Sequence, residues 1–128
     1  MHAVLPYVLT VLMFVIGLYA IAVKKNLIKV IIGVIIIHHA VNLFLVLVGY
    51  RVPVVGDPMA PIVSAEVLRG PEPWQQLLLR GVDPVPQALV LTSIVIGLSV
   101  VALMVVMAVR LHEKYGTFDL THITKLKG

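Results

Sequence analysis

Three long apolar segments dominate the chain, and shorter polar stretches separate them. They cover about residues 3–23, 27–49 and 86–110, and Lys29 is the one charge inside the first two. A membrane-spanning helix needs about 20 apolar residues to cross a hydrocarbon layer of roughly 30 Å. All three segments meet that length. We therefore predict an all-α membrane protein, a single membrane domain with three transmembrane helices.

Composition supports this class. The 128 residues are 60% hydrophobic and 12% charged, with a mean hydropathy of +1.07. Soluble domains carry about 25% charged residues, so a soluble fold would have too little polar surface. The first segment lacks a basic region before it and a small-residue cleavage site after it, which favours a retained helix over a signal peptide. The sequence has no cysteine, which excludes disulfides and thiolate metal sites.

The basic residues predict the orientation in the membrane. Lys24, Lys25 and Lys29 lie at the first connection, and the C-terminal tail at 111–128 is also basic. Positive charges collect on the cytoplasmic side of membrane helices. We expect the first connection and the C-terminus in the cytoplasm, and the N-terminus and a long loop at 50–85 outside, in the cell membrane. The net charge of +4 is thus explained by topology and does not predict nucleic-acid binding.

The long loop contains signals for two short helices. Arg69-Gly70 and Arg80-Gly81 each follow a short apolar stretch, and arginine followed by glycine is a helix-stop pattern. Trp74 suits a helix lying in the membrane interface. We expect two short surface helices there. We expect the tail to be solvated unless a partner or lipid headgroups order it.

Polar groups inside the second segment are the strongest candidates for function. His38 and Asn42 are four residues apart and share one helix face, whereas His39 points about 100° away. Polar side chains within a bilayer are costly and usually face a partner helix or a wet cavity. Histidine titrates near neutral pH and can relay protons. The alternative is that these groups only form hydrogen bonds between helices. Haem ligation would need a histidine from another chain, so no cofactor is predicted.

The third segment adds further polar and small residues. Gln87 and Thr92 are predicted either to contribute to an ion path or to pack. Lys29 could serve the same path or extend its ammonium to the cytoplasmic surface. Small residues let helices approach closely. The predicted packing residues are Gly33, Ser93 and Gly97, and the ion-path candidates are His38, His39, Asn42, Gln87, Thr92 and Lys29.

No constellation typical of an enzyme is present in the sequence. There is no acid pair, no nucleophile with its base and no glycine-rich phosphate loop, so we predict neither catalytic residues nor a metal site. Three helices are few for enclosing a transport path. The chain is therefore expected to act with other subunits, and not as an enzyme by itself.

A run in the third segment carries a family resemblance. Residues 83–96, DPVPQALVLTSIVI, resemble the signature of the MrpC family, small subunits of Mrp-type Na+/H+ antiporters, and residues 25–29 and 39–43 resemble that family's second helix. The similarity covers about 17–49 and 83–103. The K-type subunit of NADH–quinone oxidoreductases is a related three-helix protein. The longer loop and the ending EKYGTFD at 113–119 are more similar to archaeal membrane-bound hydrogenases or sulfur-reducing complexes.

The resemblance implies a place in a row of hydrophobic subunits that couple ion movement across a membrane. The K-type subunit carries glutamates on its second and third helices, and the matching positions here are near Ile35 and Ser93. The chain lacks both carboxylates, which favours the Mrp-like branch. In that branch the polar motif falls on His39, Asn42, Gln87 and Thr92.

Three hypotheses follow. In the first, the chain helps to form a path for Na+ or H+ at contacts with large antiporter-like subunits and the lipid bilayer. In the second, it is a packing subunit needed only for assembly of the complex. In the third, it forms a small homo-oligomeric transporter. The sequence does not identify the ion, or the electron donor of any catalytic partner.

Overall fold

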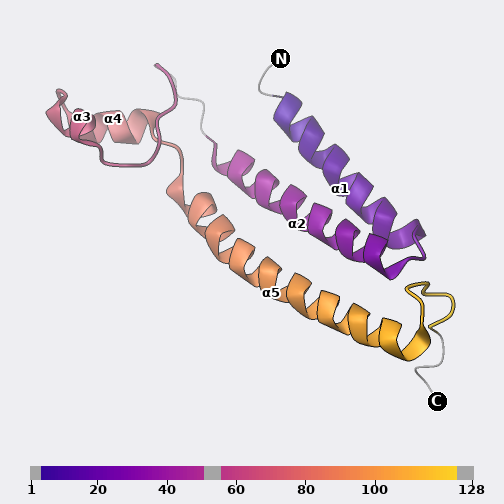
Figure 1. Ribbon diagram of the computed structural model, residues 1–128. Coiled ribbons are helices and arrows are strands. Elements are labelled where there is room, and N and C mark those ends of the chain that lie inside the picture. The colour runs from indigo at the N-terminus through magenta and orange to yellow at the C-terminus, as the bar shows by residue number, and fades with distance from the viewer. Residues whose placement is uncertain (1–3, 51–55, 124–128) are drawn as a thin grey trace.

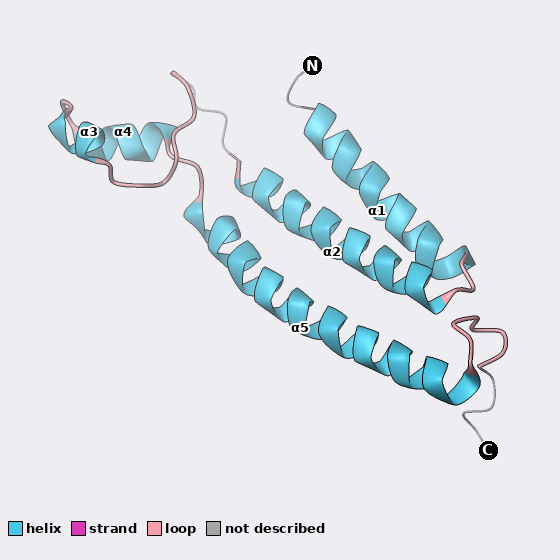
Figure 2. Ribbon diagram, in the orientation of Figure 1, coloured by secondary structure: helices cyan, strands magenta, loops and turns pink. Residues whose placement is uncertain are grey.

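The chain folds into three long helices and two short ones. The computed structural model describes residues 4–50 and 56–123. Its helices are α1 (Leu5–Val23), α2 (Leu27–Gly49), α3 (Ala65–Arg69), α4 (Pro73–Arg80) and α5 (Pro84–Tyr115). Within these ranges there is no strand (Figure 2). α1, α2 and α5 are long and apolar enough to cross a membrane, so the predicted all-α fold with three candidate spans is confirmed.

Polar side chains cap the starts of α2 and α5, and a glycine ends α5. The side chain of Asn26 accepts a hydrogen bond from the Ile28 amide, and Asp83 does the same for the Val85 amide, both at 3.0 Å. Such caps satisfy amide groups that have no partner in the first turn. Gly116, with φ 70°, ends α5 in the left-handed region. α5 therefore begins two residues before the predicted 86 and continues to Tyr115, five residues beyond the predicted 110.

The long helices lie side by side in a single row, with α2 in the middle (Figure 1). α1 packs on α2 and α2 packs on α5, but no Cα atom of α1 comes within 8 Å of one in α5. Along the direction of the helix axes, α1 begins at one end of this layer and α5 ends at the other (Figure 1). The arrangement is one helix thick, so most apolar side chains are exposed in the isolated chain.

Two glycines bring α1 and α2 into close contact. A Cβ atom on Gly17 would lie 3.1 Å from the Gly33 carbonyl oxygen, and a Cβ on Gly33 would lie 3.1 Å from the Gly17 carbonyl oxygen. Side chains at either position would therefore push the two backbones apart. At the other end of the pair, the Tyr7 hydroxyl donates a 2.8 Å hydrogen bond to the Leu47 carbonyl. The Gly17–Gly33 contact is of the tight, small-residue kind that membrane helices favour.

The connection between α2 and α5 contains α3 and α4, which pack on each other (Figure 1). Both short helices end at the predicted arginine-glycine pairs. Backbone hydrogen bonds from Met59 to Arg80 and from Val82 to Met59, at 2.9 and 3.1 Å, hold the segment before α5. The exposed indole of Trp74 lies on α4. The side of the membrane on which this connection lies stays a prediction.

The tail is the main difference from expectation. We expected it to be solvated, but residues 117–123 fold back onto the turn between α1 and α2 (Figure 1). The Leu27 amide donates to the Phe118 carbonyl at 2.8 Å, and the Leu120 amide donates to the Lys25 carbonyl at 2.7 Å. We call this pairing the tail clasp. Sequence reasoning missed it because two backbone hydrogen bonds leave no pattern in the side chains.

A local hydrogen-bond turn shapes the tail clasp. The Asp119 carboxylate accepts from the Thr121 hydroxyl at 2.7 Å and from the Thr121 amide at 2.9 Å. These bonds hold the pKa of Asp119 below its ordinary value, with smaller contributions from the nearby positive groups of His122 and Lys25. The rings of His112 and Phe118 stack 4.3 Å apart. The end of α5 is therefore attached to the first helical hairpin.

Candidate functional site

A polar cluster lies at the contact between α2 and α5, within both apolar spans. His38 and Asn42 come from α2, one turn apart, and Ser93 comes from α5. All three side chains are half-buried. The second and third segments thus meet partly through three of their few polar side chains. We call these three residues the polar cluster.

The hydrogen bonds of the polar cluster form a closed circuit. Nε2 of His38 lies 3.1 Å from both the carbonyl oxygen and the hydroxyl of Ser93. A carbonyl oxygen can only accept, so Nε2 carries the proton in this contact. The Ser93 hydroxyl donates to Oδ1 of Asn42 at 2.8 Å. The Asn42 amide nitrogen lies 3.4 Å from each ring nitrogen of His38, of which the unprotonated Nδ1 can accept.

A glycine provides the space for the imidazole. A Cβ atom on Gly97 would overlap Cε1 of His38 and would lie 2.5 Å from its Nε2. The ring therefore occupies the volume that a side chain at Gly97 would need. Gly97 was predicted as a packing residue, and here it lets the histidine lie between the two helices. The α2–α5 contact is thus shaped around one titratable ring.

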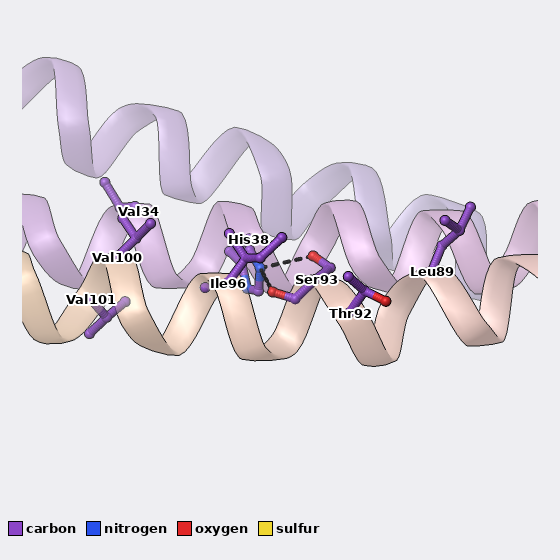
Figure 3. Close-up of a pocket in the computed structure, with 9 residues that line it drawn as sticks. Val34, His38, Leu89, Thr92, Ser93, Ile96, Val100 and Val101 are labelled. Atoms are coloured by element: carbon purple, nitrogen blue, oxygen red, sulfur yellow. Dashed lines mark hydrogen bonds between the residues drawn. The ribbon is translucent and has the colours of Figure 1, made fainter.

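Grooves flank this contact on both sides. Less exposed residues of α5 recur every three or four positions and form the stripe that faces α2; they are Pro86, Val90, Ser93, Gly97, Val101, Met104 and Ala108. One groove, of about 380 Å³, has Thr92 and Ile96 beside this stripe (Figure 3). The other, of about 560 Å³, has Ile94 and Leu98 on the opposite side. His38 lines both grooves, so its ring is reachable from either side.

The remaining candidates lie outside the polar cluster. His39 is exposed in the larger groove, and its Nδ1 is 2.8 Å from the Ile35 carbonyl oxygen of its own helix. Thr92 lines the smaller groove and donates to the Ala88 carbonyl at 3.4 Å. Gln87 and Lys29 are exposed, near the starts of α5 and α2. The structure therefore brings His38 and Asn42 into one hydrogen-bonded cluster, with His39 and Thr92 beside His38 in the two grooves, whereas Gln87 and Lys29 lie apart.

Ser93 was assigned to packing from the sequence, and its hydroxyl proves to connect His38 with Asn42. Its place on the stripe that includes Gly97 was the available signal, because residues four apart share a helix face. In the described part of the chain, no group of three or more histidine, aspartate or glutamate residues could hold a metal ion.

Comparisons with known proteins agree with this architecture. Residues 5–128 match the family model described as NADH-ubiquinone/plastoquinone oxidoreductase chain 4L. The C1 subunit of the Na+/H+ antiporter of Staphylococcus aureus, from strains including JH9 and Newman, is 34% identical over 105 residues, covering 82% of this chain and 77% of the relative.

A solved structure extends the comparison. One chain of the membrane-bound sulfane sulfur reductase, an archaeal respiratory membrane complex, is 42% identical and superposes with a TM-score of 0.73, covering 91% of this chain and 94% of that one. The expected resemblance to the MrpC family and to archaeal sulfur-reducing complexes is confirmed. The chain belongs to the NADH-ubiquinone/plastoquinone oxidoreductase chain 4L family, as a small multi-pass subunit of an ion-translocating membrane complex.

Proposed function

We propose that this subunit passes protons between its two faces through the polar cluster at the α2–α5 contact. The observation that carries the proposal is that His38 lines both grooves while bonded to Ser93. A histidine can take a proton at one ring nitrogen and release the other proton from the second nitrogen. His38 would then connect proton-exchanging groups of the subunits on either side.

The cluster can support such a transfer. When Nδ1 takes a proton, the ring becomes a cation with both nitrogens as donors. The Ser93 carbonyl oxygen already accepts from Nε2 at 3.1 Å. A flip of the Asn42 amide would let its oxygen accept from Nδ1 in place of the Ser93 hydroxyl. Release of the Nε2 proton toward the second groove leaves a neutral ring with its proton on Nδ1, and a flip of the ring then restores the starting tautomer. Asn42 and Ser93 are thus positioning residues for His38, and the neighbouring subunits supply the proton donor and the final acceptor.

The proposal includes the surroundings of the chain. The partners are large antiporter-like subunits, and the ions are H+ and, through their coupling, Na+, because the relatives in Staphylococcus aureus are Na+/H+ antiporter subunits. The basic residues Lys24 and Lys25 lie beside the tail clasp. Arg110 and Lys114, in the last turns of α5, lie at this same end of the long helices. This clustering supports a cytoplasmic C-terminus and an outside N-terminus.

A matched pair of serines tests the relay. Ser93→Ala removes the hydroxyl beside His38, whereas Ser99→Ala removes one that donates only to Val95 of its own helix, at 3.0 Å. In vesicles containing equal amounts of assembled complex, we expect His38→Gln to slow proton flux about 100-fold, since glutamine cannot carry a proton. Ser93→Ala should slow it less, and Ser99→Ala should leave it unchanged. Normal flux in assembled His38→Gln complex would overturn the proposal.

A second candidate function is assembly alone. It is favoured by the closed circuit of hydrogen bonds, in which each described polar group of the cluster already has a partner. Hydrogen bonds between membrane helices contribute about 0.6–2 kcal/mol each. In that case His38→Gln and Ser93→Ala would lower the yield of complex, and flux per assembled complex would stay normal.

A further inference from the structure

His39 has a defined hydrogen-bonding state and an open side. Its Nδ1 lies 2.8 Å from the Ile35 carbonyl oxygen, which can only accept, so Nδ1 carries a proton. In the neutral ring, Nε2 is then an acceptor. No hydrogen bond to that atom is present within residues 4–50 and 56–123. The ring is exposed in the groove of about 560 Å³ between α2 and α5.

The surroundings of this acceptor are apolar. The groove is lined by aliphatic side chains such as Leu43 and Val46 on α2 and Ile94 and Leu98 on α5, and Leu43, Ile94 and Leu98 are exposed. The most apolar 18-residue stretch of α5 has no buried residue in the isolated chain. Lipid tails could cover the aliphatic residues, but they offer no hydrogen-bond donor to His39. A protein helix can provide both.

We propose that a transmembrane helix of a neighbouring subunit lies in this groove and donates a hydrogen bond to Nε2 of His39. The donor is a hydroxyl, amide or amino group on an otherwise apolar helix. The proposal rests on the membership of the chain in a complex of several subunits, and it does not depend on the proton relay through His38. His39, assigned above to the ion path as a prediction, becomes a contact that selects the partner.

A third groove in the same chain, between α1 and α2, provides an internal control. It has a volume of about 240 Å³ and is lined by Thr10, Phe14 and Val41, among others. The Thr10 hydroxyl is buried and donates to the Pro6 carbonyl at 2.7 Å. Among the described residues that line it, no polar atom requires a donor from outside. Whatever covers this groove should be insensitive to changes at His39.

The test uses a photo-crosslinking amino acid in the purified complex, placed either at Leu43 in the 560 Å³ groove or at Val41 in the α1–α2 groove. We expect the probe at Leu43 to crosslink to another subunit. His39→Leu should reduce that product about fivefold, because the acceptor is lost. His39→Gln should keep most of it, because the amide oxygen can accept. The product at Val41 should be the same in both variants.

Two results would overturn the inference. The first is a probe at Leu43 that crosslinks only to lipid. The second is the same response of the Leu43 product to His39→Leu and His39→Gln, whether both are unchanged or both are lost. If His39→Leu prevents assembly, the yield of His39→Gln complex decides, since only that variant retains an acceptor. Proton flux through His38→Gln is a separate measurement, so failure of the relay and failure of this contact are distinguishable.

Discussion

The two helix contacts of this subunit are built in opposite ways. α1 and α2 meet backbone to backbone at Gly17 and Gly33, beside apolar side chains such as those of Ile37 and Ala20. α2 and α5 meet around an imidazole and two smaller polar side chains, in space left by Gly97. Both contacts use glycine, but the first uses it to bring backbones together and the second to make room for a titratable group.

On the proposed relay, the difference separates a contact that holds the fold from a contact that serves function. An apolar glycine contact gives close packing and has no chemistry to offer. A polar contact inside a bilayer must satisfy each donor and acceptor, and it persists where the groups have a task. Substitutions in the first contact should therefore affect assembly, and substitutions in the second should affect ion movement.

The largest effect is expected at the α1–α2 contact. Gly33→Leu places a side chain against Ala20 and against the Gly17 carbonyl oxygen, and backbone atoms cannot move aside. We expect about a tenfold loss of assembled complex, measured by quantitative blotting after purification. Ala22→Leu, at an exposed position of α1, is the matched control and should assemble normally. Equal yields for both variants would contradict the packing role.

A smaller effect on yield, with a large effect on flux, is expected at Gly97. In Gly97→Ala, the new methyl group would overlap the His38 ring, which can rotate away because it is a side chain. Assembly should fall by about twofold or less, whereas proton flux should fall about as far as in His38→Gln, by roughly 100-fold. If Gly97→Ala lowers yield but leaves flux per complex normal, the two contacts are not functionally different.

Removing the tail clasp should loosen the α2–α5 contact from one end. A chain ending at Gly116 lacks the Phe118 carbonyl and the Leu120 amide, which form hydrogen bonds with the turn between α1 and α2. We expect yield to fall by about twofold, with flux per assembled complex preserved, because the polar cluster lies far along α5 from this end. The chain has no cysteine, so a disulfide between introduced cysteines on α2 and α5 can report their separation. Unchanged disulfide formation would show that the clasp is not needed.

The smallest effect is a pH dependence of the tail clasp. The pKa of Asp119 in the folded tail is below its ordinary value near 3.8. Its stabilising contribution is therefore present above that ordinary value and is lost as the pH falls through the lowered folded value. Hydrogen exchange of the Leu120 amide, which donates to the Lys25 carbonyl, should increase relative to its intrinsic rate only at strongly acidic pH. Thr121→Val removes the hydroxyl that lowers the pKa and should move this increase to higher pH.

The three spans and the short loop helices were predictable because each leaves a local pattern. Apolar length identified the spans, and arginine-glycine pairs identified the ends of α3 and α4. The pairing of His38 with Asn42 followed from their spacing of four residues. The contribution of Ser93 did not, because it depends on which face of α5 meets α2. The tail clasp was also inaccessible, since its bonds join the backbones of Lys25, Leu27, Phe118 and Leu120.

The single-file arrangement of α1, α2 and α5 has a genetic consequence. A layer one helix thick has little interior of its own, and the neighbouring helix proposed for the α2–α5 groove would cover part of one of its two broad surfaces. Compensating mutations for a defect at Gly17 or Gly33 should arise within this gene, because both sides of that contact are encoded there. Compensating mutations for a defect at His39 should instead arise in the gene of another subunit. The genes in which suppressor mutations arise would thus distinguish contacts within this subunit from contacts between subunits.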